Sequence, residues 1–344
     1  MITWKRTGIF LLIAIVLVVC YFAFLAPPPY YMHEGGFLER SGSKFGTGVP
    51  YNQFNTTGRF VKQNPYSYWY IYKEGEQPGI YKESAGGIKS VRLTDNSARC
   101  MNLYLDETTG EEWIYYVDDD NNLWRVNDSG TINEHIRDHC PYIFIIGSSL
   151  LYMTEDNKIY EAGVFDFDGI QNDQGLLRAE ASNPVFGYRD DYWLYYEAYN
   201  AAGASAVFCK HIEYTPEPGA EIICPSVPDK WFPFVSSSLL YVDHGNLYAL
   251  SGKTNKLLYE GIPADSRIYY TGQYIFFEGD KENNTDTYPL YRIDAADGKN
   301  LKKELALDNI YCELYFFEGH LYQYDTVKGN LHRIYRLSAR LNVK

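Results

Sequence analysis

The sequence predicts an all-β protein, most simply a β-propeller of seven four-stranded blades, and three observations support this prediction. Aromatic residues make up 17% of the 344 residues, with 34 tyrosines, and flat rings favour strands because they pack well on a pleated, partly buried surface. After residue 30, no long stretch spaces its apolar residues as a helix would. The third observation is a repeated unit, described below, and such repeats are typical of solenoids and propellers.

The chain is expected to begin with a membrane anchor. Gly8 to Ala26 is a stretch of 19 residues without a charge, about the length that crosses a bilayer core. Lys5 and Arg6 precede it, and no Lys or Arg follows until Arg40, so the positive-inside rule places the rest of the chain outside. We therefore predict a cytoplasmic stub at 1–7, a single transmembrane helix at 8–26 and an extracytoplasmic remainder at the cell membrane.

Cleaved and lipidated forms of this segment are the alternatives. Cleavage after Ala26 or Ala23 requires a small residue where the chain has Phe24 or Tyr21. The run from Leu17 to Cys20 is similar to a lipoprotein box, but Val19 occupies the place of a small residue. An uncleaved anchor fits the residues better than either alternative.

Residues 27–56 are predicted to form a tether, because they are rich in Pro, Gly and Ser, a composition of spacers rather than of cores. The propeller is predicted over 57–344. The formal net charge of −13 argues against a surface that binds nucleic acid or another anionic polymer. It fits a solvated acidic exterior.

A two-part motif recurs seven times and is the strongest signal in the chain. Its first part is an apolar–aromatic pair at intervals of 43, 37, 43, 46, 35 and 46 residues, at Ile71-Tyr72, Ile114-Tyr115, Leu151-Tyr152, Leu194-Tyr195, Leu240-Tyr241, Ile275-Phe276 and Leu321-Tyr322. Its second part follows a short turn and reads Ile80-Tyr81-Lys82, Leu123-Trp124-Arg125, Ile159-Tyr160-Glu161, Val207-Phe208-Cys209, Leu247-Tyr248-Ala249, Leu290-Tyr291-Arg292 and Ile334-Tyr335-Arg336. Seven matches in register indicate seven copies of one structural unit.

Each unit also has an apolar run before the pair, and most have a fourth run after the second part. Four strands in about 42 residues is the size of a propeller blade. The run Trp113 to Val117 is apolar on both faces, as expected for a strand between two neighbouring blades. Six or eight blades and an open solenoid are the alternatives. Because only 341–343 remain for a last strand, we expect ring closure to use a strand from Gly35 to Arg40 or from the Tyr51 region.

These units resemble a Gram-positive surface domain of unknown function that is similar to the YWTD propeller of LDL receptor-related proteins. The resemblance covers about residues 55–340 and is carried by Trp113 to Tyr116, Leu123 to Arg125 and Trp193 to Tyr196. No unit reads YWTD, so the ligands of the receptor propellers do not carry over. The resemblance implies a cell-surface propeller with no reaction attached to it.

Two acid-rich stretches are candidate ion sites. Asp118-Asp119-Asp120-Asn121-Asn122 lacks the Gly and Glu that an EF-hand loop needs, since Leu123 and Ser129 occupy those positions. We interpret it first as a polar turn between two strands, where Asp and Asn are favoured. Asp166-Phe167-Asp168-Gly169 with Asn172-Asp173 is a second such loop, and an ion site is the alternative for both.

His135, His139 and Cys140 would converge on a zinc ion only on a helix. In a strand, four residues span about 13 Å, so we predict no metal here, and no cofactor. The sequence shows no G-x-S-x-G or C-x-x-C motif, and we predict no catalytic residues.

Five cysteines follow the anchor. A hairpin turn at 215–219 with residue 214 opposite 219 places Cys209 opposite Cys224. We predict a Cys209–Cys224 disulfide in an oxidising exterior, with two buried thiols as the alternative. A second bridge between Cys100 and Cys140 is a weaker hypothesis.

Ligand binding is predicted at loops that share one face of the propeller. The longest join the second and third strands of three units, at Glu74 to Gly79, Glu197 to Ser205 and Gly279 to Tyr288. The candidate ligand-binding residues are Asp118, Asp119, Asp120, Tyr199 and Asn200, unless these loops are only tolerated insertions. The favoured hypothesis is an anchored binding module for an envelope protein, peptide or glycan, without nucleic acid; a carbohydrate-active or other hydrolytic surface enzyme and an envelope sensor or assembly factor are the alternatives.

Overall fold

A computed structural model provides the structure. It describes residues 60–62, 69–83, 89–106, 108–180, 183–185, 193–211, 219–234, 238–264, 266–270, 274–280, 288–307, 312–317, 320–325 and 330–336. All of these belong to one compact unit, Met32–Ser338. The predicted anchor, tether and closing strands lie outside the described residues. Within the described part of the chain, no helix has the length and apolar character needed to cross a membrane.

The described residues form seven antiparallel sheets, here numbered 1 to 7 in chain order, each with its strands hydrogen-bonded in sequence order. Sheet 1 contains β1 (Phe60–Lys62), β2 (Trp69–Lys73), β3 (Gly79–Glu83) and β4 (Ser90–Thr94). Sheet 2 contains β5 (Arg99–Leu105), β6 (Glu112–Val117), β7 (Leu123–Asn127) and β8 (Asn133–Arg137). Sheet 3 contains β9 (Tyr142–Ile146), β10 (Ser149–Met153), β11 (Lys158–Gly163) and β12 (Leu176–Glu180), with the helix α3 (Phe167–Gln171) before its last strand.

The remaining sheets repeat this order. Sheet 4 contains β13 (Asn183–Val185), β14 (Trp193–Tyr199), β15 (Ser205–His211) and β16 (Glu221–Cys224). Sheet 5 contains β17 (Lys230–Phe234), β18 (Ser238–Asp243), β19 (Asn246–Ser251) and β20 (Thr254–Glu260). Sheet 6 contains β21 (Ile268–Tyr270), β22 (Tyr274–Glu278), β23 (Tyr288–Asp294) and β24 (Lys302–Leu307), and sheet 7 contains β25 (Cys312–Phe317), β26 (His320–Asp325) and β27 (Asn330–Arg336).

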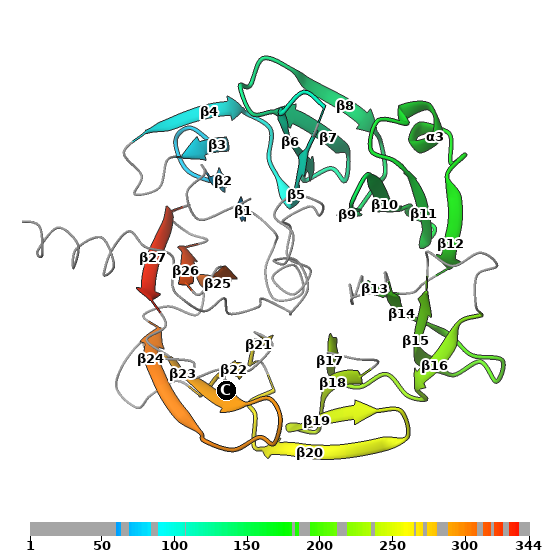
Figure 1. The fold of residues 1–344 in the computed structure, drawn as a ribbon, viewed down its shortest axis with the longest axis vertical. Coiled ribbons are helices and arrows are strands. Elements are labelled where there is room, and N and C mark those ends of the chain that lie inside the picture. Colours follow the sequence, from blue (N-terminus) through cyan, green and yellow to red (C-terminus); the bar gives the residue numbers. More distant parts are fainter. Residues whose placement is uncertain are drawn as a thin grey trace, which may run out of the picture. The chain divides into compact units, whose positions relative to one another are not determined.

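The repeated motif marks the same two strands in every sheet. Each apolar–aromatic pair lies in the second strand, and each second part lies in the third. In β6, residues Trp113 to Val117 are all buried, which confirms that this strand is covered on both faces. The all-β fold and its repeated unit are therefore confirmed, and the architecture is propeller-like (Figure 1).

A β-bulge recurs at one position of the repeat. In sheets 1 to 6 the register between the third and fourth strands shifts between the apolar residue and the aromatic residue of the motif's second part, at Ile80/Tyr81, Leu123/Trp124, Ile159/Tyr160, Val207/Phe208, Leu247/Tyr248 and Leu290/Tyr291. A bulge bends and twists its strand. It thus makes the exposed edge of each outer strand a poorer template for further strand pairing.

The structure contradicts the predicted disulfide. Cys209 and Cys224 are both buried and form no disulfide with each other. Cys209 lies opposite Glu221, whereas Cys224 lies opposite Val207. The prediction placed the turn with residue 214 opposite 219, whereas the strands pair with Cys209 opposite Glu221, so the predicted register was wrong. The weaker hypothesis of a Cys100–Cys140 bridge is likewise not realised, since both of these thiols are free and buried.

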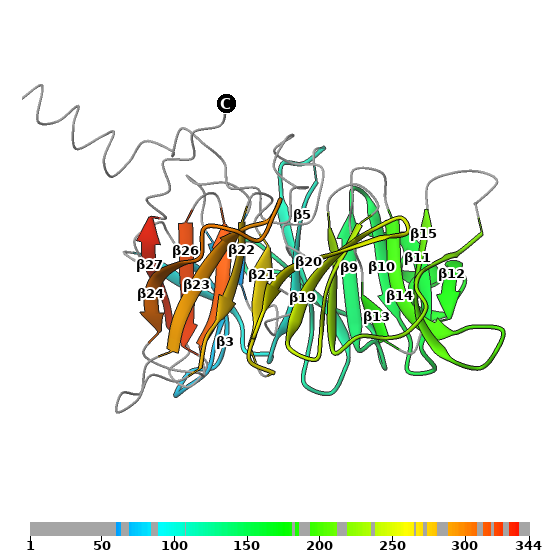
Figure 2. The ribbon, with the colours of Figure 1, turned by 90° about the horizontal axis from the view of Figure 1, so that it is seen from below.

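The sheets pack face to face around buried apolar side chains. Figure 1 shows them following one another in chain order, with the first strand of each innermost, and Figure 2 shows the strands standing side by side between two sets of loops. One cluster joins sheets 1 and 2 through Tyr70, Ile80 and Tyr116. A second joins sheets 2 and 3 through Tyr115 and Tyr152, and burying such aromatic surface is the main source of stability.

A buried amide adds a specific brace between sheets 2 and 3. The Asn102 side chain accepts from the Ile145 backbone N at 3.2 Å and donates to the carbonyls of Cys100 at 2.9 Å and Ile143 at 3.4 Å. Asn102 is fully buried, so leaving these groups unpaired would be costly. The brace holds the inner strands β5 and β9 in one register.

Candidate functional site

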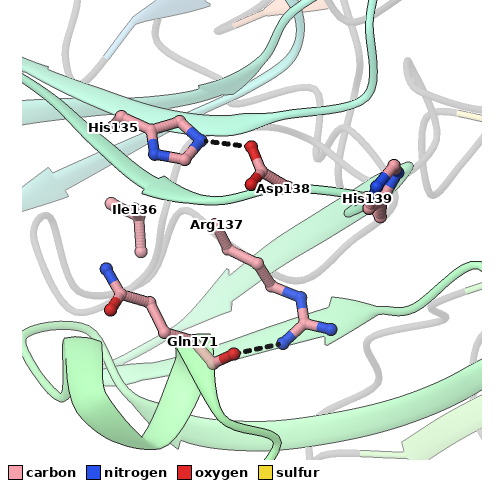
Figure 3. A pocket seen from close by; sticks show the side chains of 6 residues that line it. All are labelled: His135, Ile136, Arg137, Asp138, His139 and Gln171. Carbon is pink, nitrogen blue, oxygen red and sulfur yellow. Dashed lines mark hydrogen bonds and ion pairs between the residues drawn. The ribbon is translucent and has the colours of Figure 1, made fainter.

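A polar pocket lies between the outer strand of sheet 2 and the helix of sheet 3 (Figure 3). Its volume is about 460 Å³, and its lining residues are His135, Ile136, Arg137, Asp138, His139 and Gln171. The first five belong to β8 and the turn after it, and Gln171 ends α3. The pocket therefore exists only because sheet 3 inserts a helix against its neighbour.

The helix begins where the sequence predicted an acidic loop. Asp166 is its N-cap, and the Asp166 carboxylate accepts from the Gly169 backbone N at 3.1 Å. Such a cap satisfies one of the amide groups that the first turn leaves unpaired. Asp168 lies in the first turn, where the helix dipole favours a negative charge. These acids thus start a helix of five residues rather than surround an ion.

Arg137 fastens the end of this helix to sheet 2. Its guanidinium donates to the carbonyl of Ile170 at 2.6 Å and to that of Gln171 at 3.3 Å. It also pairs with the Asp173 carboxylate at 2.7 Å and lies 5.4 Å from the Tyr152 ring centre. Only 11% of the Arg137 side chain is exposed, so a single cation satisfies the helix end and forms the floor of the pocket.

Arg125 of sheet 2 contacts the start of the segment between β11 and β12, which contains α3. Its guanidinium lies 4.0 Å from the Trp113 ring centre, 4.9 Å from that of Phe165 and 4.3 Å from that of Phe167. It pairs with Glu134 at 2.6 Å. Cation–π contacts strengthen when they are desolvated, and these hold the insertion at a second point.

Each of the two pocket histidines has a carboxylate partner. His135 Nε2 lies 2.9 Å from the Asp138 carboxylate, and His139 Nδ1 lies 2.9 Å from Glu155 in the turn between β10 and β11. The His135 ring also meets Trp124 edge to face at 4.9 Å. These contacts orient both imidazoles at the pocket rim.

The three residues considered as zinc ligands, His135, His139 and Cys140, have different surroundings in the structure. Cys140 is fully buried, and its thiol donates to the Tyr142 carbonyl at 3.7 Å. Burial raises the pKa of this thiol to about 12, so it stays protonated and is neither a ready ligand nor a nucleophile. Among the described residues, no group of three or more His, Cys, Asp or Glu side chains is arranged to hold a metal.

The acid-rich stretch after β6 is a turn, as interpreted from the sequence. The Asp118 carboxylate accepts from the backbone N of Asp120 at 3.0 Å and of Asn122 at 2.7 Å. It also accepts from Trp124 Nε1 at 2.8 Å. The turn adjoins the pocket, because the Cys140 backbone N donates to the Asn121 carbonyl at 2.6 Å.

The five predicted ligand-binding residues do not line the pocket. Asp118 is occupied within its own turn, while Asp119 and Asp120 are exposed beside it. Tyr199 is 70% exposed at the end of β14, and the Asn200 side chain accepts from the backbone of Ala202 and Ala204. These two residues belong to sheet 4, so the structure does not bring all five together, and their role stays a prediction.

Sequence reasoning missed Arg137 and Gln171. The histidines drew attention to residues 135–139, but nothing local relates Arg137 to Asp173, 36 residues later. The only available signal was indirect. Unit 3 has a longer connection between its third and fourth strands than its neighbours, and a long insertion within a compact repeat is often functional.

No protein-family model and no curated protein matches this sequence. Among solved structures, a puromycin-hydrolysing peptidase of Mycobacterium tuberculosis matches with a TM-score of 0.53 and 13% identity, covering 90% of this chain and 56% of its own. YCF48 bound to D1 peptide matches with a TM-score of 0.43 and 13% identity, covering 78% of this chain and 89% of its own. The computationally designed protein Ika8 matches with a TM-score of 0.45 and 10% identity, and the match covers 80% of this chain and 82% of Ika8.

These similarities concern the fold alone. The chain spans little more than half of the peptidase, and identity is 13%. The peptidase match agrees with the fold described above, and none of the three gives a reaction or ligand to this protein.

Proposed function

We propose that the chain is a membrane-anchored, extracytoplasmic propeller of seven blades that binds an envelope ligand. The pocket between β8 and α3, with the adjoining turn at 118–122, is its binding site. A cavity of about 460 Å³ is within the usual size range of ligand sites, which is roughly 300 to 1,000 Å³. This pocket is the single observation that carries the proposal.

The finer features of the proposal come from the sequence. The uncharged stretch 8–26 supports the anchor, and the Lys and Arg distribution supports an outside propeller. The W-I-Y-Y and L-Y-R units support a surface propeller of the Gram-positive type. Seven copies of the motif support seven blades, with the fourth strand of the last blade supplied by residues near the N-terminus, at Gly35 to Arg40 or in the Tyr51 region.

A binding measurement with the full-length chain tests this function. The chain is placed in detergent micelles and exposed to separated protein and polysaccharide fractions of a bacterial envelope. We expect saturable binding that falls at least tenfold in the double variant His135→Ala/Gln171→Ala. Neither side chain is buried, so the fold should persist, as circular dichroism would show.

His244→Ala is the matched control. His244 also pairs with a neighbouring carboxylate, Asp243, at 3.0 Å, and its side chain is 88% exposed in the turn between β18 and β19. Unchanged binding in this variant would assign the loss to the pocket. Equal binding by the wild type and the double variant would contradict the proposal, as would turnover of the bound material.

A further inference from the structure

The charged groups that line the pocket are already paired within the protein. Asp138 pairs with His135, Glu155 with His139, and Asp173 with Arg137. A charged ligand would have to compete with these pairs for the same side chains. The pocket is therefore a poor match for a strongly cationic or anionic ligand.

Hydrogen-bonding capacity remains after the charges are paired. Arg137 Nε has no hydrogen-bond partner among the described residues, but it is buried and out of reach of a ligand. The side-chain amide of Gln171, which supplies two donors and one acceptor, makes no hydrogen bond within the described part of the chain; in Figure 3 it lies on the side of Ile136 and His135. Donors and acceptors thus stand side by side in one cavity.

An apolar ligand also fits the lining poorly. Ile136 is the only apolar residue among the six, and apolar ligands need predominantly apolar walls. A hydroxyl group both donates and accepts hydrogen bonds, which matches a mixture of imidazole, amide and carboxylate groups. A ligand with several neutral hydroxyls would use this mixture without disturbing the ion pairs.

We infer that the pocket binds a sugar unit of a neutral glycan. This inference rests on the proposed function, since it names the ligand class for the same site. The Gln171 amide and the Asp138 carboxylate bind the hydroxyls, with the His135 ring beside them. Because the pocket is open and polar, we expect a modest affinity for the glycan. The loss of a single hydrogen bond should then change Kd several-fold.

Isothermal titration of the full-length chain with defined oligosaccharides tests the inference. The neutral probes are chitotetraose, cellotetraose and mannotetraose, and the charged comparators are tetragalacturonate and spermine. We expect at least one neutral probe to bind, with less than a twofold change in Kd between 50 and 500 mM NaCl. A neutral ligand leaves the ion pairs intact, so salt has little to screen.

Variants assign the binding to the pocket. Gln171→Ala should raise Kd about fivefold, and Gln171→Ala with Asp138→Asn about twentyfold, whereas His244→Ala should leave it unchanged. A preference for tetragalacturonate or spermine that salt abolishes would overturn the inference, as would neutral binding that the variants do not affect.

Failure of the inference and failure of the proposed function are distinguishable. If no neutral probe binds but an envelope fraction still binds in a manner that His135→Ala/Gln171→Ala abolishes, the site stands and the glycan inference is wrong. If neither the probes nor the fractions depend on the pocket, both are wrong.

Discussion

Two acid-rich segments of similar composition have different structural roles in this protein. The segment at 118–122 closes a hairpin within sheet 2, and the Asp118 carboxylate is satisfied inside that turn. The segment at 166–173 forms a capped helix that sheet 2 holds through Arg137 and Arg125. The first segment is local and the second joins two sheets. The two segments have similar compositions, so composition alone does not predict their roles. The roles differ because the segments contact different parts of the protein.

The largest loss of stability should come from removing Arg137, which joins sheet 2 to the end of α3 in sheet 3. Arg137→Ala leaves the carbonyls of Ile170 and Gln171 and the Asp173 carboxylate without their donor. Because Asp173 is 38% exposed, part of this cost is relieved by water, and we expect a loss of about 3 kcal/mol in the free energy of unfolding. Urea titration followed by tryptophan fluorescence measures it. A loss below 1 kcal/mol would mean that α3 docks without this arginine.

Replacing Asp118 in the turn at 118–122 should lower the free energy of unfolding somewhat less. Asp118→Ala removes the acceptor of Asp120 N, Asn122 N and Trp124 Nε1 within one partly buried turn. These groups regain water in part, so the expected loss is about 2 kcal/mol rather than the full sum of the bonds. Asp118→Asn keeps one acceptor and should lose about half as much. Thermal melts of Arg137→Ala, Asp118→Ala and Asp118→Asn rank the three losses of stability. A larger loss in Asp118→Ala than in Arg137→Ala would reverse the comparison.

The helix cap should have a smaller effect than either contact. Asp166→Ala removes the acceptor of Gly169 N, which typically costs about 1 kcal/mol. Asp166→Ser keeps an acceptor and serves as its control. Hydrogen exchange of residues 167–171 should speed up in the Ala variant alone, and faster exchange in both variants would remove the cap as the cause.

A pH-dependent contact between sheets 1 and 2 extends the comparison. Tyr70 donates to the Glu112 carboxylate, and burial raises the pKa of Glu112 above its ordinary value despite this hydrogen bond and the charge of Lys82. The folded state therefore holds this proton more tightly than the unfolded chain does. Stability from this group is present below the ordinary Glu pKa, about 4.3, and is lost as the pH rises through the raised pKa.

Glu112→Gln tests this contact. The variant should be more stable than the wild type at pH 8 by more than it is at pH 4, because its amide never ionises. Differential melts across this range measure the trend. A constant difference at all pH values would show that Glu112 titrates alike in both states.

Replacing the exposed acids Asp119 and Asp120 should change stability least. Asp119→Asn with Asp120→Asn should change the free energy of unfolding by less than about 0.5 kcal/mol. Adding Ca²⁺ or a chelator should leave the melting temperature unchanged, since the Asp118 carboxylate is already bound within its turn. A rise in melting temperature with Ca²⁺ that the double variant abolishes would restore the ion-site alternative.

Much of the fold was predictable because it depends on local patterns. An apolar–aromatic pair buried on both faces requires neighbours on both sides, and its recurrence places seven units in one register. The register at Cys209 was not predictable, because the hairpin between β15 and β16 turns at a different point from the one assumed and already pairs Cys209 with Glu221 before the bulge at Val207/Phe208.

The sequence by itself determined the strands, their order and the repeat, because side-chain alternation along a strand is a property of neighbouring residues. Only the tertiary structure decided what the acids and histidines do. Arg137 meets Asp173 across 36 residues, and Arg125 meets Phe165 across 40. Such contacts arise from the packing of one sheet against the next, and it is this packing that forms the pocket.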